Sequence, residues 1–230
     1  MQQSLSKLQD ALLVRFASRR AYDLCENVTP ALEALRAEFP NVKMGVASNS
    51  DSRILQAMRE LDLGRFFNLQ LEGDIQEGQD QQRRQQVGGP PPTLSYTILA
   101  EKPSPRFFEL AIDRAEPFVF TSSSSASATK EGNEDEQQPR LRSNQVLFVG
   151  DHLLEDFRAA RDAGMHALWL RRAPLADHTG TDQKRSPARI VGPHNEDAER
   201  ILEQEGLTEE EKLCTISSML GVVEWLRARR

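Results

Sequence analysis

Short apolar runs that alternate with amphipathic helical patterns constrain the fold of this chain most strongly. The runs have the composition of buried strands, and they are residues 42–47, 66–71, 94–99, 145–149 and 166–170. The helical patterns lie at residues 7–24, 31–39, 51–61, 104–112, 153–163 and 209–227. Strands that alternate with helices predict right-handed crossovers and a parallel sheet. We therefore expect an α/β fold, with a Rossmann-like parallel sheet and helices on both of its faces.

Three polar segments interrupt this alternation. Residues 74–93 are rich in glutamine and proline, residues 121–140 are rich in serine and charged side chains, and residues 176–188 have a milder polar composition. Such segments bury too little apolar surface to offset the entropy of an ordered chain. We expect disordered inserts at 74–93 and 121–140 and a flexible loop at 176–188. They account for a hydrophobic fraction of 38%, below the average of about 45–50%.

Composition and charge argue against several classes of partner. No apolar run approaches the ~18 residues of a membrane-spanning helix, and no apolar core of a secretory signal is present. A net charge of -6 disfavours nucleic acid as the main partner. Cys25 and Cys214 cannot by themselves form a disulfide framework or a four-ligand zinc site. We expect no membrane partner, no nucleic-acid partner, and a cytoplasmic or nuclear location.

Polar side chains that could bind a phosphate group follow two of the predicted strands. In open parallel sheets, ligands bind at the carboxyl ends of the strands. Ser48 and Asn49 follow residues 42–47, where a hydroxyl and a helix N-terminus can hold a phosphoryl oxygen. Lys102 follows residues 94–99 and can neutralise phosphate as a compact cation. The same residues also suit an ordinary helix start and a solvated surface lysine, so both interpretations stay open.

Two carboxylates follow the strand at residues 145–149. Asp151 leaves this strand and Asp156 lies in the first turns of the next helix, so together they offer the hard oxygen ligands that Mg²⁺ prefers. Gly150 permits a sharp turn and the close approach of a ligand. Acidic residues are also common at helix N-termini because the helix dipole favours them. We expect His152 to face solvent in this loop.

Taken in chain order, these segments resemble the haloacid dehalogenase-like (HAD) hydrolase superfamily. VASNSDSRI, EKPSPRFFELAI and VLFVGDHLLEDFRAARDAGMHALWL are similar to its second, third and fourth motifs, and the resemblance covers about residues 22–226 without the polar inserts. It implies that Ser48, Asn49 and Lys102 bind phosphate and that Lys102 is catalytic. It also implies that Asp151 and Asp156 hold Mg²⁺, and that a small phosphorylated metabolite is hydrolysed rather than dehalogenated.

The first motif of that superfamily, an apolar strand that ends in Asp-x-Asp, has no counterpart here. Before Val42 the only aspartates are Asp10 and Asp23, and neither follows an apolar strand. The resemblance then implies that the nucleophile and the first, central strand are absent. It also implies that residues 1–28 are residual helices of the cap insertion and that residues 29–230 form the core.

These absences suggest an N-terminally incomplete phosphatase-type protein that is catalytically inactive as given, with weak or absent Mg²⁺ binding. A non-catalytic binding or regulatory module on the same scaffold is one alternative. The other is a different Rossmann-like protein whose acidic residues only mimic the motif.

Overall fold

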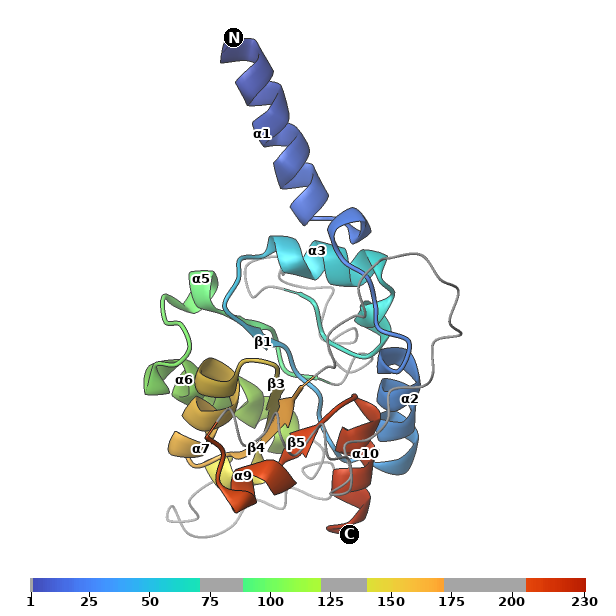
Figure 1. Cartoon of the computed structure of the whole chain (residues 1–230), viewed down its shortest axis with the longest axis vertical. Helices are drawn as coiled ribbons and strands as arrows, with labels where there is room; N and C mark the ends of the chain where they lie inside the picture. Colours follow the sequence, from blue (N-terminus) through green and yellow to red (C-terminus); the bar gives the residue numbers. More distant parts are fainter. Residues whose placement is uncertain (1, 71–88, 121–139, 172–205) are drawn as a thin grey trace, which may run out of the picture. The chain divides into compact units, whose positions relative to one another are not determined.

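The computed structural model describes residues 2–70, 89–120, 140–171 and 206–230 (Figure 1). The chain divides into two structural units. Unit 1 consists of Met1–Leu24 and Asn41–Gln145, and unit 2 consists of Cys25–Pro40 and Val146–Arg230. Along these stretches the structure alternates helices with short parallel strands, which confirms the predicted mixed α/β class.

Unit 1 contains a two-stranded parallel ladder and most of the N-terminal helices. Its strands are β1 (Ala47–Ser48) and β2 (Thr93–Leu94), paired with Ala47 opposite Thr93. Its α-helices are α1 (Gln2–Phe16), α3 (Arg53–Glu60), α5 (Ser95–Ile98) and α6 (Pro105–Phe120), and its 3₁₀ turns are η1 (Arg19–Ala21), η2 (Leu63–Arg65) and η4 (Ser143–Gln145). Leu55, Leu69 and Leu94 form a buried cluster that anchors α3 against the ladder.

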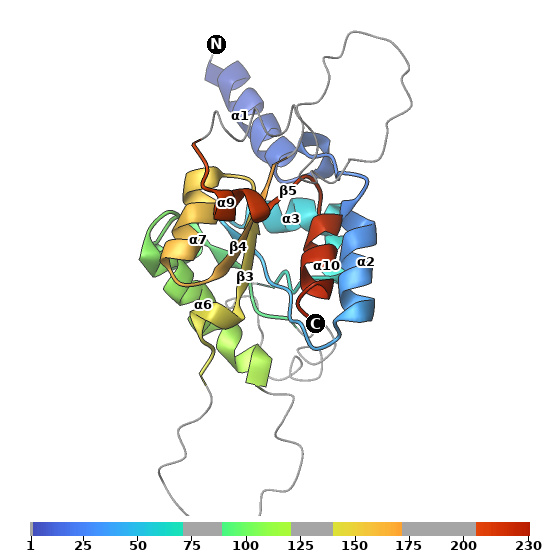
Figure 2. The same ribbon diagram turned by 60° about the horizontal axis from the view of Figure 1, so that its bottom comes forward.

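Unit 2 contains a three-stranded parallel sheet in the order β3-β4-β5. Its strands are β3 (Leu147–Gly150), β4 (His166–Leu170) and β5 (Thr215–Ile216). Its helices are α2 (Val28–Glu38), the π-helical turn η5 (Leu153–Arg158), α7 (Ala159–Asp162), α9 (Glu209–Leu213) and α10 (Leu220–Arg227). Figure 2 shows α10 beside α2, where the Arg227 guanidinium donates to the Glu38 carboxylate from Nε at 2.8 Å. The carboxyl end of β3 leads directly into η5, which positions the acidic loop.

Proline explains why β1 is shorter than the predicted strand at residues 42–47. The described strands form two separate ladders, and β1 pairs only from Ala47 onward. The facing segment contains Pro90–Pro92, which have no N–H to donate to a ladder, so pairing begins at Thr93. Gly45 accommodates this segment, because a Cβ there would lie 2.8 Å from Pro90 Cγ.

The structure also corrects other boundaries. Residues 89–93 were expected to belong to the insert at 74–93, but they are buried and Thr93 is part of β2. Residues 66–70 form no strand, because this apolar run instead inserts Leu69 into the core of unit 1. Strand β5 was missed, because two residues between helical patterns carry no period of their own. The remaining insert residues, 74–88, 121–139 and 176–188, lie outside the described residues.

Candidate functional site

In unit 1, the side-chain amide of Asn49 joins the two loops that were expected to bind phosphate. Its Nδ2 donates to the carbonyl oxygen of Lys102 at 3.0 Å, and its Oδ1 accepts the backbone N–H of Lys102 at 2.8 Å. Ser48 ends β1 directly before this amide and is half-buried. The structure therefore brings the Ser48–Asn49 loop to the backbone of Lys102, 53 residues further along the chain from Asn49.

Lys102 itself lies in a tight turn that starts α6. The backbone N–H of Ser104 donates to the carbonyl of Glu101 at 2.9 Å, and that of Phe107 donates to the carbonyl of Ser104 at 3.0 Å. The Lys102 ammonium lies 5.9 Å from the centroid of the Phe107 ring, which is fully buried. This distance is at the outer range of a cation–π contact. Lys102 is half-buried.

An acidic side chain lies close to the Ser48–Asn49 loop, and its charge is neutralised by an arginine. Asp51 accepts the backbone N–H of Arg53 and its Nε–H, both at 2.9 Å. The side-chain hydrogen bond from Arg53 is the main reason why the pKa of Asp51 lies below its usual value. An ionised Asp51 paired with Arg53 adds no net charge beside the Ser48–Asn49 loop.

In unit 2, Gly150 and Asp156 lie in very close contact at the carboxyl end of β3. A Cβ on Gly150 would be 2.4 Å from both Cβ and Cγ of Asp156, closer than real atoms approach. Asp156 is 4% exposed, and its Oδ2 accepts the backbone N–H of His152 at 3.0 Å. The buried carboxylate therefore holds the loop that contains Asp151 and His152 in a closed turn.

The backbone carbonyls and His152 stabilise the same turn. The carbonyl of His152 accepts the N–H groups of both Asp156 and Phe157, at 3.0 and 3.2 Å, which produces the wide π-helical turn. His152 is exposed, as predicted, and its Nδ1 accepts the N–H of Glu155 at 3.1 Å as a helix cap.

The carbonyl of Asp151 accepts Nε1–H of Trp169 at 3.1 Å. The backbone of Asp151 is thus anchored while the residue stays exposed.

The donor set of this loop fits a hydrated Mg²⁺ ion better than a fully protein-ligated metal. No three His, Cys, Asp or Glu side chains gather as a metal site among the residues that the structure describes. Mg²⁺ commonly keeps several waters and is held by one or two carboxylates together with substrate phosphate. Asp151 presents an exposed carboxylate for such an ion, and Asp156 presents a buried one. The assignment of both residues as metal ligands stays a prediction.

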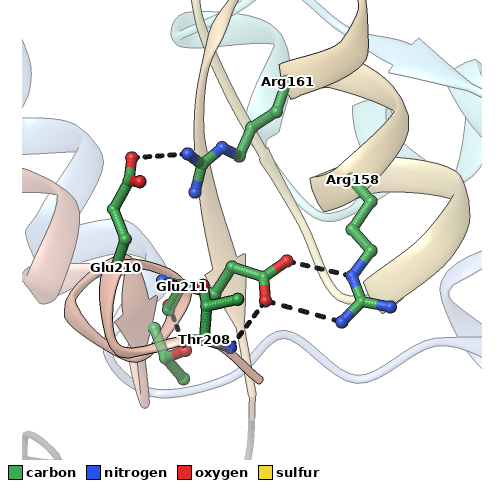
Figure 3. A network of polar contacts seen from close by, with 6 residues as sticks. Arg158, Arg161, Thr208, Glu210 and Glu211 are labelled. Atoms are coloured by element: carbon green, nitrogen blue, oxygen red, sulfur yellow. Dashed lines mark hydrogen bonds and ion pairs between the residues drawn. The ribbon is translucent and has the colours of Figure 1, made fainter. Parts of the chain in front are cut away.

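Sequence reasoning missed a polar network that supports the acidic loop from the C-terminal side (Figure 3). Arg158, at the end of η5, donates from Nε to Oε1 of Glu211 at 3.0 Å. Glu211 Oε2 also accepts the Thr208 N–H at 2.9 Å, and Thr208 Oγ1 accepts the Glu211 N–H at 3.2 Å. The Thr-x-x-Glu spacing is a capping-box signal that the sequence contains. A second ion pair, Arg161 with Glu210 at 2.5 Å, joins α7 to α9.

The polar network changes the pKa of Glu211, the acid at its centre. Burial alone would raise the pKa of Glu211, but hydrogen bonds from Arg158 and Thr208 outweigh burial and leave the pKa below its usual value. Glu211 is therefore ionised at neutral pH and joins α9 to η5. Its partner Arg158 is two residues beyond Asp156 on that turn, so the network also restrains the helix that carries Asp156.

Comparison with known proteins supports a hydrolase relationship for part of the chain. Residues 99–193 match the family model of HAD-hydrolase-like proteins. The predicted resemblance is thus confirmed for this range, which contains Lys102, Asp151 and Asp156. No curated protein matches the chain.

A solved structure described as a HAD phosphatase from Thermococcus onnurineus is similar at 18% identity and a TM-score of 0.46. The similarity covers 76% of this chain and 58% of that one, so this chain spans little more than half the length of that protein. Within the described ranges, no helix is both long and apolar enough to cross a membrane.

Proposed function

We propose that this chain weakly binds Mg²⁺ and a small phosphorylated molecule through its strand-end loops, as a HAD-type phosphatase does. One observation carries the proposal. The range that matches the HAD-hydrolase-like family contains Lys102, Asp151 and Asp156 in a single stretch. The closed turn around Asp151, and the contact of Asn49 with Lys102, give these residues defined local positions that suit such roles.

Each residue has its own part in the proposed binding. Lys102 supplies a compact positive charge for the phosphate oxygens, and Ser48 supplies a hydroxyl donor close to the start of α3. Asp151 is the exposed carboxylate for Mg²⁺, and Asp156 keeps the turn of Asp151 closed through the His152 N–H. Mg²⁺, when bound, would supply Lewis-acid positive charge at the Asp151 loop of unit 2.

We further propose that the chain as given does not hydrolyse its ligand at a useful rate. None of its 230 residues forms an Asp-x-Asp pair at the end of an apolar run, so the family's nucleophile has no counterpart. Loss of a covalent nucleophile can lower turnover by roughly 10⁶-fold. From a typical turnover of about 10 per second, this leaves on the order of one event per day. Binding without turnover would suit a binding or regulatory module, which is the alternative function.

Binding and turnover can be tested separately. Tb³⁺ is a suitable probe of hard oxygen ligands, and Trp169, which is hydrogen-bonded to the Asp151 carbonyl, is placed to sensitise its luminescence. We expect luminescence that excess Mg²⁺ displaces, that Asp151→Asn abolishes, and that Asp162→Asn retains, since Asp162 is an exposed acid at the end of α7. Equal Tb³⁺ binding by both variants would refute the metal site.

Turnover is measured as phosphate release from a panel of phosphate monoesters with Mg²⁺. We expect no release above the rate of buffer alone. Robust release that Asp151→Asn abolishes would overturn the proposed inactivity while supporting the metal site. The absence of both metal and phosphate binding would favour an unrelated protein whose acidic residues only mimic the motif.

A further inference from the structure

The contact between Asn49 and Lys102 uses both ends of the Asn49 amide. An amide side chain has one acceptor oxygen and an NH₂ donor group. The oxygen accepts the N–H of Lys102 at 2.8 Å, and the nitrogen donates to the carbonyl of the same residue at 3.0 Å. Asn49 therefore pairs with Lys102 as a neighbouring strand would, although the two residues belong to different loops. This pairing commits one N–H and one oxygen lone pair of the amide to protein backbone.

The pairing occurs where the Lys102 loop has few donors of its own. Pro103 follows Lys102 and has no N–H, so the next backbone donor is Ser104, which closes the turn onto Glu101 at 2.9 Å. Asn49 is exposed, so its hydrogen bonds do not rescue buried polar groups. Their main consequence is geometric, because fixing both the N–H and the C=O of Lys102 fixes the direction of its Cα–Cβ bond.

We propose that Asn49 is a positioning residue that directs the Lys102 side chain, and that it is not itself a ligand of phosphate. Lys102 is then held at two points. Asn49 holds its backbone, and the buried Phe107 ring lies 5.9 Å from its ammonium. This arrangement reduces the number of orientations of a flexible side chain before any ligand arrives. The inference rests on the proposed function insofar as Lys102 binds phosphate, and it reassigns Asn49 from the set expected by resemblance.

A double-mutant cycle distinguishes positioning from direct binding. The probe is inorganic phosphate, titrated with Mg²⁺ present and followed by ³¹P NMR. Asn49→Ala should weaken phosphate binding about fivefold, the equivalent of one ordinary hydrogen bond. In a Lys102→Met background the same substitution should have no further effect, because Asn49 acts only through Lys102. Effects that multiply in the double variant would show that Asn49 contacts phosphate itself, and would overturn the proposal.

Asn68 offers a matched control in the same unit. Its amide also bonds to backbone, because Nδ2 donates to the Gly89 carbonyl at 3.4 Å and Oδ1 accepts the Gln70 N–H at 3.1 Å. Asn68→Ala removes the same kind of contact without touching Lys102, so it should leave phosphate affinity unchanged. A fivefold loss with Asn68→Ala as well would mean that any loosening of unit 1 weakens binding, and would refute a specific role for Asn49.

A second measurement needs no ligand, so it separates this inference from the proposed function. Hydrogen exchange of the Lys102 amide, read by NMR, should accelerate in Asn49→Ala. Asn49→Asp keeps the acceptor oxygen and should retain most of that protection. Unchanged exchange in Asn49→Ala would overturn the positioning role. If the wild-type chain binds no phosphate while exchange responds as expected, the proposed function fails but the orientation of Lys102 by Asn49 stands.

Discussion

The substitution Gly150→Ala should destabilise unit 2 strongly. The new Cβ would lie 2.4 Å from Cβ and Cγ of Asp156 and 2.5 Å from its Oδ2, and Asp156 is 4% exposed with little room to move. Overpacking of this kind costs about 1–3 kcal/mol. Displacing the carboxylate from the His152 N–H removes a hydrogen bond to a charged group, worth about 1.5–3 kcal/mol. Replacing glycine with alanine also restricts the unfolded chain, which returns about 0.4–1 kcal/mol of folding stability. The net loss is then about 2–5 kcal/mol.

Urea unfolding followed by tryptophan fluorescence measures this loss directly, because Trp169 and Trp225 both lie in unit 2 with Gly150. At a mid-range slope of about 2 kcal/mol per molar urea, the loss moves the midpoint down by roughly 1–2.5 M. Gly64→Ala is the control, followed by circular dichroism so that unit 1 is also observed. Its nearest non-bonded neighbour would be Leu69 Cδ1 at 3.7 Å, an ordinary contact, so its midpoint should hardly change.

The clash also predicts a rescue. Asp156→Gly removes all three atoms that the new methyl group would meet, so Gly150→Ala should have little additional effect in that background. An equal loss in both backgrounds would refute the steric explanation. A loss below about 2 kcal/mol in the wild-type background would refute the estimated magnitude, because it falls under the expected net loss.

Other perturbations test the core, the polar network and the thiols. The Phe157 ring is 1% exposed, so Phe157→Ala should lower the free energy of unfolding by about 3–5 kcal/mol in a denaturant titration. Leu8 is 57% exposed on α1, so Leu8→Ala should change it by no more than about 0.5 kcal/mol. Burial raises the pKa of Glu211, but hydrogen bonds from Arg158 and Thr208, with the charge of Arg158, together outweigh burial and leave the pKa lowered. The stabilisation from Glu211 is therefore complete above the usual unfolded pKa of about 4.3 and is lost as the pH falls through the folded value. Urea titrations at neutral and acidic pH should therefore show wild type more stable than Glu211→Gln only at neutral pH; an equal difference at both would contradict this. Burial raises the pKa of Cys214, so alkylation followed by mass spectrometry should be slower than that of an unstructured cysteine peptide, and equal rates would exclude this effect.

Much of the fold of unit 2 was predictable, because its signals are local. Strand β4 has the predicted bounds, since residues 166–170 form an apolar run with a β-compatible length. Gly164 was expected at a helix C-terminus, and its φ of 80° confirms the left-handed conformation that glycine adopts there. The helix after β3 was also expected, but its first part is a π-helical turn. That difference depends on the His152 carbonyl, which accepts the N–H of Phe157 as well as that of Asp156, and no periodic pattern contains this contact.

The sequence by itself determined which chemical groups follow the strands. Lys102, Asp151 and Asp156 are recognisable because apolar runs and turn residues place them after predicted strands, and those patterns extend over only a few neighbours. Only the tertiary structure decided what Asn49 and Glu211 contact, since each bonds to a residue 53 positions away. Such hydrogen bonds depend on distance and direction between separate segments. Local hydrophobic period does not encode them, so the role of Asn49 had to come from the folded chain.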